Sequence, residues 1–182
     1  DYQSFLQQTQ PLVSKIQKKD SSFYRINQTY EFSKNDAMLL GYNGLTHYSS
    51  TFNQAINSLT PKFGIAQSHI WNSGYGTTPL CDSLFGVKYI LSQSMEPACY
   101  TKLLQSSSTA ALYQNDMALS IAYAAKVSSL TPAFSDTNPF HNQNTLLNTI
   151  AGTNQSYYQD IPYTAAQTGS TGWGYTFTAT SS

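Results

Sequence analysis

The chain opens with an amphipathic pattern over residues 4–19. Its apolar positions fall near helical spacing, and its last turns carry lysines that complement a helix dipole: Phe5, Leu12, Val13, Ile16, Lys15, Lys18 and Lys19. This pattern predicts an opening helix within residues 1–20. Pro11 either starts or kinks that helix, so we expect its continuous part to be residues 10–19.

Short apolar runs predict strands in the middle of the chain. The clearest is 87–92, where Val87, Tyr89 and Leu91 recur at every second position after a turn at Gly86. Further strands are predicted at residues 23–26, 99–105, 110–114 and 118–124, the last apolar enough for the centre of a sheet. Two late strands, 157–165 and 173–180, are joined by a turn at 169–172, and we expect them to pack on the sheet.

Two more helices complete the predicted fold. The first covers residues 51–59, is capped by Ser50 or Thr51 and ends before Pro61. The second covers residues 142–151 and ends at Gly152. A chain of 182 residues suits one domain with its own core. The predicted fold class is therefore α+β, a single domain with a central mixed β-sheet flanked by helices.

Charge and hydropathy narrow the classes of partner. Only 10% of the residues are charged, against roughly 25% in soluble domains, and nine basic residues balance nine acidic ones. A net charge of zero gives no long-range field toward nucleic acid or anionic lipid, so we expect no nucleic-acid partner. No stretch reaches the roughly 18 to 20 apolar residues that cross a bilayer, and the start is not a signal peptide, so we expect a soluble domain.

The aromatic residues and the cysteines each leave two interpretations open. Fourteen tyrosines suit a surface that faces carbohydrate, and they suit an ordinary tyrosine-rich core equally well. Cys81 and Cys99 flank the strand at 87–92, and they form either a disulfide or two buried thiols. Closing a loop of this size by a disulfide contributes about 3 kcal/mol in the chain-entropy model.

No catalytic or cofactor motif stands out in the sequence. His47, His69 and His141 are too scattered for a metal site, and no Gly-x-Ser-x-Gly elbow is present. The glycine-rich run at 74–78 lacks the lysine of a phosphate-binding loop and is interpreted as a turn. We therefore assign no catalytic residue and no metal ligand, and we expect no cofactor.

Several segments, in this order along the chain, resemble one family. They are Phe23-Tyr24-Arg25-Ile26, the stretch from Asn35-Asp36 through Gly41-Tyr42 to Tyr48-Ser49-Ser50, the run from Asp82 to Ser92 with Leu84-Phe85-Gly86-Val87-Lys88-Tyr89 at its centre, the run from Asn115-Asp116-Met117-Ala118-Leu119 to Tyr123, and Asn138-Pro139-Phe140 with Gln143-Asn144 and Leu146-Leu147. Over roughly residues 20–155 the chain resembles the YfhO family of multi-spanning bacterial membrane proteins, which look like lipid-linked sugar transferases of the GT-C type. Ser120 stands where the family usually has proline, and residues 166–182 match poorly.

The resemblance implies a location, partners and an activity. The chain is expected to be an extracytoplasmic domain, excised from its transmembrane helices, on the outer face of the plasma membrane of a Gram-positive bacterium. The full-length protein is expected to transfer a sugar from a polyprenyl-phosphate donor to teichoic acid or a related envelope polymer. The catalytic aspartate of that class lies in a loop outside these residues, so the fragment alone is expected to be inactive. The alternative is a non-catalytic domain that binds glycan through tyrosines and Trp71 or Trp173.

The polar members of these segments are the candidate substrate-binding residues: Arg25, Asn35, Asp36, Tyr48, Ser49, Ser50, Asp82 and Lys88. Each has a structural alternative. Arg25 and Asp36 can form an ion pair, residues 48–50 can cap a helix, and Lys88 can be a solvated strand residue.

Overall fold

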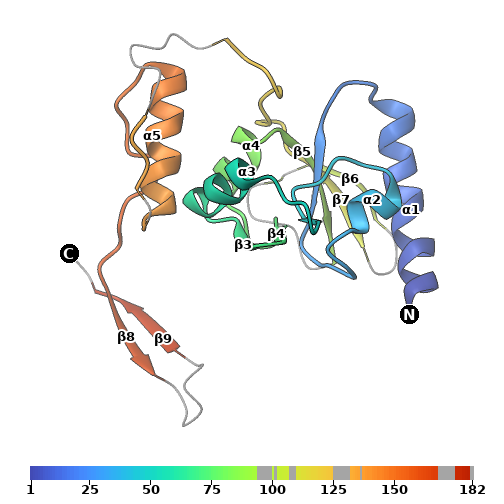
Figure 1. Ribbon diagram of the computed structural model, residues 1–182, viewed down its shortest axis with the longest axis horizontal. Coiled ribbons are helices and arrows are strands. Elements are labelled where there is room, and N and C mark those ends of the chain that lie inside the picture. Colours follow the sequence, from blue (N-terminus) through green and yellow to red (C-terminus); the bar gives the residue numbers. More distant parts are fainter. Residues whose placement is uncertain are drawn as a thin grey trace.

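The computed structural model describes residues 1–93, 100, 102–106, 110–124, 132–135, 137–167 and 175–180. Its centre is a four-stranded sheet in the order β1 (Arg25–Gln28), β5 (Val87–Ser92), β7 (Ala111–Gln114) and β6 (Lys102–Ser106). β1 and β5 are parallel, whereas β7 is antiparallel to both β5 and β6. The predicted α+β class with a central mixed sheet is confirmed, and β5 has the bounds that its apolar run predicts (Figure 1).

Both faces of this sheet are covered, which explains the apolar character of β5. Tyr89 and Leu91 point into one buried cluster, and Val87 and Ile90 point into the other. A strand that is buried on both faces has a nearly continuous apolar sequence instead of a clean alternation. This is why residues 87–92 stand out in the sequence.

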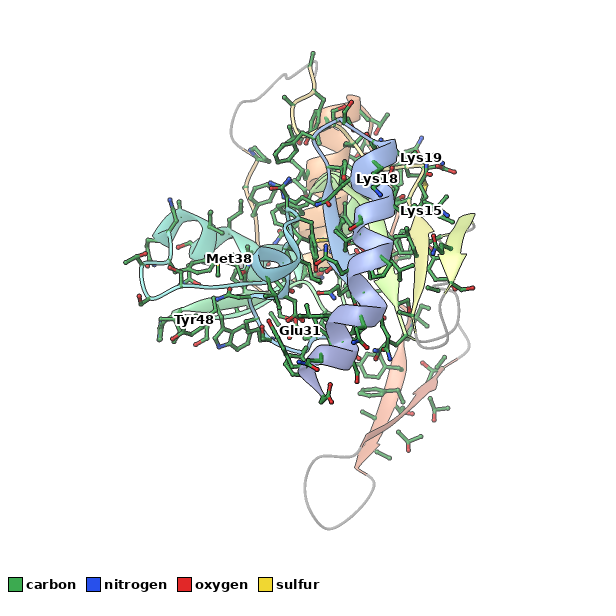
Figure 2. The ribbon with its side chains drawn as sticks, turned by 90° about the vertical axis from the view of Figure 1, so that its right-hand side faces the viewer. Lys15, Lys18, Lys19, Glu31, Met38 and Tyr48 are labelled. Carbon is green, nitrogen blue, oxygen red and sulfur yellow. The ribbon has the colours of Figure 1, made fainter. Side chains whose placement is uncertain are left out.

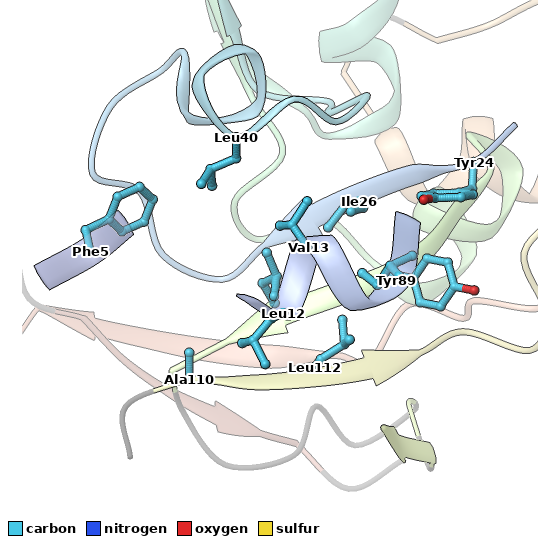
Figure 3. Close-up of a cluster of buried hydrophobic side chains, with 11 residues drawn as sticks. Phe5, Leu12, Val13, Tyr24, Ile26, Leu40, Tyr89, Ala110 and Leu112 are labelled. Carbon is cyan, nitrogen blue, oxygen red and sulfur yellow. The ribbon is translucent and has the colours of Figure 1, made fainter. Parts of the chain in front are cut away.

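Helix α1 (Tyr2–Lys19) covers the first face. Leu12, Val13 and Ile16 lie in the same cluster as Ile26 and Leu112 of the sheet (Figure 3). The prediction that Pro11 limits the helix to residues 10–19 is wrong, because α1 is continuous from Tyr2 and is capped by the Asp1 carboxylate. Pro11 lies on the exposed side of α1, where water can satisfy the carbonyl that the missing N–H leaves unpaired.

The second face of the sheet packs against shorter helical segments. These are η1 (Thr60–Phe63), α4 (Pro79–Leu84) and α5 (Pro139–Ala151), which contribute Phe63, Cys81 and Leu146 to the cluster around Val87 and Ile90. α5 begins three residues earlier than predicted, because the Asn138 side chain caps it, and it ends at Gly152 as predicted. The two clusters give the sheet a core on each side.

The connection from β1 to β5 carries the helix predicted at residues 51–59, which begins three residues later at Gln54, together with elements that the sequence does not predict. It holds α2 (Asp36–Leu40), α3 (Gln54–Leu59) and a small antiparallel sheet in the order β2 (His47–Tyr48), β4 (Trp71–Ser73) and β3 (Ala66–Ser68). The predicted cap of α3 is wrong, because Asn53 occupies that position and accepts hydrogen bonds from the backbone of Ala55 and Ile56.

Two predictions about the later strands are wrong. Residues 118–124 form no strand, because Leu119 N donates to Ser83 O and this contact draws the chain away from the sheet toward α4. The late strands β8 (Tyr163–Gln167) and β9 (Tyr175–Ala179) pair with each other and project away from the central sheet (Figure 1). Tyr163 and Phe177 contact each other in this hairpin and stay exposed, and the predicted turn at 169–172 lies outside the described residues.

Candidate functional site

A pocket lies at the carboxyl ends of β1 and β5. It has a volume of about 280 Å³ and is lined by Asn27, Gln28, Thr29, Gly74, Tyr75, Gly76, Thr77, Pro79, Asp82, Ile90 and Tyr100. α4 leads into β5 through the tight turn at Phe85-Gly86, where Gly86 has a φ of 69° that favours glycine. The amino end of α4 therefore lies at the carboxyl ends of the two parallel strands, the place where α/β sheets commonly bind ligands.

Asp82 is the central residue of this pocket. Its carboxylate is 3% exposed and accepts three hydrogen bonds: from Tyr100 Oη at 2.5 Å, from Thr77 Oγ1 at 2.7 Å and from Asn27 Nδ2 at 3.2 Å. Burial raises the pKa of the Asp82 carboxyl, and the three hydrogen bonds oppose that rise only in part. A buried carboxyl with a raised pKa in a polar pocket is a typical feature of functional sites.

Asn27 joins the pocket wall to the sheet. Its side-chain amide donates to Gly74 O at 2.8 Å and to Thr77 Oγ1 at 2.9 Å, and its Oδ1 accepts from Gln28 N at 2.9 Å. Gly74 has no room for a side chain, because a Cβ there would lie 2.5 Å from Asn27 Oδ1. The glycine-rich segment is a turn, as predicted, and it is fixed against β1.

The chemistry of the pocket suits a small ligand with hydroxyl groups. Its polar groups are a carboxyl, amides and hydroxyls, including Thr29, whose Oγ1 lies 2.9 Å from the buried Ser92 Oγ behind it. Tyr75 is 60% exposed and adds a ring and a hydroxyl to the lining. A volume of about 280 Å³ lies at the small end of ligand sites. The pocket can therefore orient a group of roughly the size of one sugar ring.

Of the eight predicted site residues, only Asp82 lines this pocket. Arg25 lies at the other end of β1, where its Nη1 donates to Phe85 O at 2.6 Å. Burial lowers the pKa of the Arg25 guanidinium. The ion pair considered between Arg25 and Asp36 is absent from the described part of the chain, where Asp36 accepts only from its own loop.

The side chain of Lys88 is partly exposed, but its ammonium group is engaged within the fold. Its Nζ lies 2.6 Å from Asp20 Oδ2 and 3.4 Å from Ser22 Oγ. Tyr89 Oη donates to the same carboxylate oxygen at 2.7 Å. Burial opposes ionisation of Asp20, but the hydrogen bonds from Lys88, Ser22 and Tyr89 outweigh it and lower the pKa of that carboxyl. Lys88 thus attaches β5 to the end of α1.

The remaining predicted residues shape the loops around α2. Asp36 is 2% exposed and accepts hydrogen bonds from the backbone of Phe32 and Ser33, at 2.8 and 2.9 Å. Asn35 Oδ1 accepts from Tyr48 N at 3.0 Å, which joins α2 to β2. Ser49 Oγ accepts from Thr51 N, and Ser50 is exposed. The helix-cap interpretation of residues 48–50 is wrong, because Asn53 caps α3.

An aromatic pair lies on the small sheet. Tyr48 and Trp71 occupy opposite positions on β2 and β4, and Tyr48 is 45% exposed. The ammonium group of Lys34 lies 4.7 Å from the centre of the Trp71 ring and forms an ion pair with Glu31. One face of the indole is therefore already occupied. Trp173, the other tryptophan considered for glycan binding, lies outside the described residues.

Cys81 is a fully buried free thiol in the second core cluster. Burial, aided by the nearby Asp82 carboxylate, raises the pKa of the Cys81 thiol. Its proposed partner Cys99 lies outside the described residues. Over the residues that the structure describes, no group of three His, Cys, Asp or Glu side chains is placed to hold a metal ion.

The hydrogen-bond partners of Asp82 were not predicted from the sequence. Asn27 and Thr77 lie 55 and 5 positions before Asp82, and Tyr100 lies 18 positions after it. A local signal existed for part of the site: Thr78 followed by Pro79 is a typical helix start, and Thr78 Oγ1 does accept from Cys81 N. Recognising that start would have placed Asp82 in the first turn of a helix before β5.

Comparison with known proteins assigns the family. No curated protein and no solved structure matches the chain. Among the described residues, no helix combines the length and apolar character required to cross a membrane. A family described as "Bacterial membrane protein YfhO" matches residues 1–180, which extends beyond the 20–155 range of the recognisable motifs. The chain therefore belongs to the YfhO family of bacterial membrane proteins.

Proposed function

We propose that this chain is the extracytoplasmic domain of a membrane-embedded glycosyltransferase, and that the Asp82 pocket forms part of its substrate site. The full-length protein transfers a sugar from a polyprenyl-phosphate donor to teichoic acid or a related envelope polymer, on the outer face of the plasma membrane of a Gram-positive bacterium. Membership of a bacterial membrane protein family supports the location at a membrane. The transferase class rests on the motif resemblance.

The observation that carries the site assignment is the geometry around Asp82. A buried carboxyl with a raised pKa, a phenol, a threonine hydroxyl and an amide converge on one small pocket. Such groups position a sugar through its hydroxyls, and orientation of this kind accelerates a transfer without any group of this domain taking the proton. The catalytic base is supplied by the rest of the protein, so Asp82 is a positioning residue.

The test uses the full-length protein in membranes, with Asp82→Asn as the variant. The substitution keeps the side-chain volume and removes the carboxyl. We therefore expect polymer glycosylation per inserted protein to fall about 10- to 100-fold, which is the effect on rate of losing one hydrogen bond to a charged group. Asp36→Asn is the matched control, because Asp36 is equally buried and lines no part of this pocket. Glycosylation that stays normal in Asp82→Asn at normal protein levels contradicts the assignment.

The aromatic pair of Tyr48 and Trp71 favours a second candidate, a non-catalytic domain that binds wall glycan. Stacking on the exposed Tyr48 ring and the partly exposed Trp71 opposite it would hold a sugar ring outside the Asp82 pocket. Titration of the chain with teichoic acid and peptidoglycan fragments tests it. Binding that is lost in Trp71→Ala and kept in Asp82→Asn supports this candidate, and the opposite pattern supports the substrate pocket.

A further inference from the structure

The carboxyl end of α1 carries a cluster of positive charge that the net charge of the chain conceals. Lys15, Lys18 and Lys19 are all exposed, and their spacing of three and four residues places them on one side of the helix. Figure 2 shows them together near the carboxyl end of α1, with Glu31 at its other end. Three of the nine basic residues of the chain thus lie within five positions.

Among the described residues, no acidic side chain neutralises this cluster. In the described part of the chain, none of the three lysines forms an ion pair, and the nearest acid in sequence, Asp20, is already bonded to Lys88 and Tyr89. The lysines complement the dipole of α1, but that interaction leaves their ammonium groups in water. They are therefore available to an anionic partner.

An exposed apolar side chain follows the three lysines in the sequence. Phe23 follows α1 by four residues and is 54% exposed, and the guanidinium of Arg25 lies 5.8 Å from the centre of its ring. A soluble anionic polymer offers nothing to an exposed phenyl ring, whereas the boundary between headgroups and acyl chains accepts one. The combination of lysines and an aromatic residue therefore matches a lipid surface better than a free polymer.

We propose that Lys15, Lys18, Lys19 and Phe23 form a membrane-contact surface that binds the phosphates of anionic lipid headgroups. Because the chain belongs to a family of membrane proteins, a lipid bilayer is the anionic surface that we expect closest to these residues. The proposal is independent of the transferase activity and of the Asp82 pocket. An unpaired lysine at an anionic surface strengthens partitioning about fivefold, so the three together contribute on the order of 100-fold.

The test measures co-sedimentation of the 182-residue chain with vesicles of phosphatidylcholine that contain about one third phosphatidylglycerol. We expect binding to these vesicles, much weaker binding to phosphatidylcholine alone, and loss of binding as salt rises, because salt screens the attraction. Lys15→Gln/Lys18→Gln/Lys19→Gln should reduce partitioning on the order of 100-fold. Glutamine keeps the helix propensity, and unchanged urea unfolding verifies that the variant is folded.

Two further variants separate the alternatives. Ser50→Glu/Gln54→Glu/Ala55→Glu lowers the net charge by the same three units at exposed positions in and before α3, and it should bind as the parent does. Phe23→Ser should weaken vesicle binding about fivefold through the loss of apolar contact. Absence of binding to anionic vesicles, or equal loss in both triple variants, overturns the proposal. Unchanged binding in Phe23→Ser, together with equally tight binding to soluble polyphosphate, overturns the assignment to lipid.

Discussion

The contact between Gly74 and Asn27 allows a quantitative test of how the Asp82 pocket is held together. In Gly74→Ala the new Cβ would lie 2.5 Å from Asn27 Oδ1, closer than real Cβ atoms approach, and 3.0 Å from Leu45 Cβ, which is a tight contact. Asn27 cannot move aside freely, because its Oδ1 and Nδ2 bond the backbone of Gln28 and Gly74. One of these partners must shift.

The expected cost combines two effects. Overpacking of a rigid site costs about 1–3 kcal/mol, and each hydrogen bond of Asn27 that is lost costs about 1 kcal/mol more. We therefore expect Gly74→Ala to lower the free energy of unfolding by about 2–4 kcal/mol. Urea unfolding followed by circular dichroism measures this change.

A double-mutant cycle with Asn27→Ala identifies the cause. Removal of the Asn27 amide removes the main clash, so Gly74→Ala should cost about 1–2 kcal/mol less in that background. Gly76→Ala is the control: its φ of 80° costs about 1 kcal/mol for a residue with a Cβ, but no atom lies within 4 Å and no coupling to Asn27 is expected. Additive effects of Gly74→Ala and Asn27→Ala, or a cost of Gly74→Ala below about 0.5 kcal/mol, would refute the reasoning.

Three other predictions concern titratable groups. The pKa of Asp20 is lowered in the folded chain, so the stability that its ionised carboxylate contributes is present above the unfolded pKa of 3.8 and is lost as the pH falls below that value. In Asp20→Asn, the urea concentration at the unfolding midpoint should therefore fall less steeply with acidification than in the parent. The pKa of Asp82 is raised, so its effect has the opposite sign: the free energy of unfolding falls as the pH rises from 3.8 through the folded pKa. In Asp82→Asn, the urea midpoint should change less with pH over that range. A steeper profile in either variant counts against the sign. The Cys81 thiol should react with a thiol reagent only after unfolding, because it is fully buried and its pKa is raised; rapid labelling of Cys81 in the folded chain would contradict its burial.

The sequence predicts elements whose signal is local and strong. β5 is identified to the residue because both of its faces are buried, and α1 is identified because its apolar stripe persists over several turns. α2, α4 and the strands of the small sheet have only two to six residues each, so their patterns of apolar and polar residues are too short to identify a helix or a strand. The apolar run at 118–124 gives a false strand, because hydropathy cannot show that the chain bonds to α4 instead.

The candidate site was predictable only in part. Asp82 is found because it belongs to the most recognisable motif, but its role depends on Asn27 and Tyr100, which only the folded sheet brings to it. Arg25 and Lys88 belong to equally recognisable segments, but their side chains hold the fold together. Arg25 bonds β1 to the turn before β5, and Lys88 bonds β5 to the end of α1. Motif membership therefore does not separate residues that line a pocket from residues that support the fold.

The parallel pairing of β1 with β5 has a consequence for the order in which the chain acquires its structure during synthesis. Residues 29–86 must be made before β1 can pair with β5, and Leu112 completes the cluster under α1 later still. Long-range contacts of this kind form slowly. Until β5 emerges, the apolar stripe of α1 has no paired strands to cover, so α1 and β1 remain a chaperone-sensitive segment during synthesis.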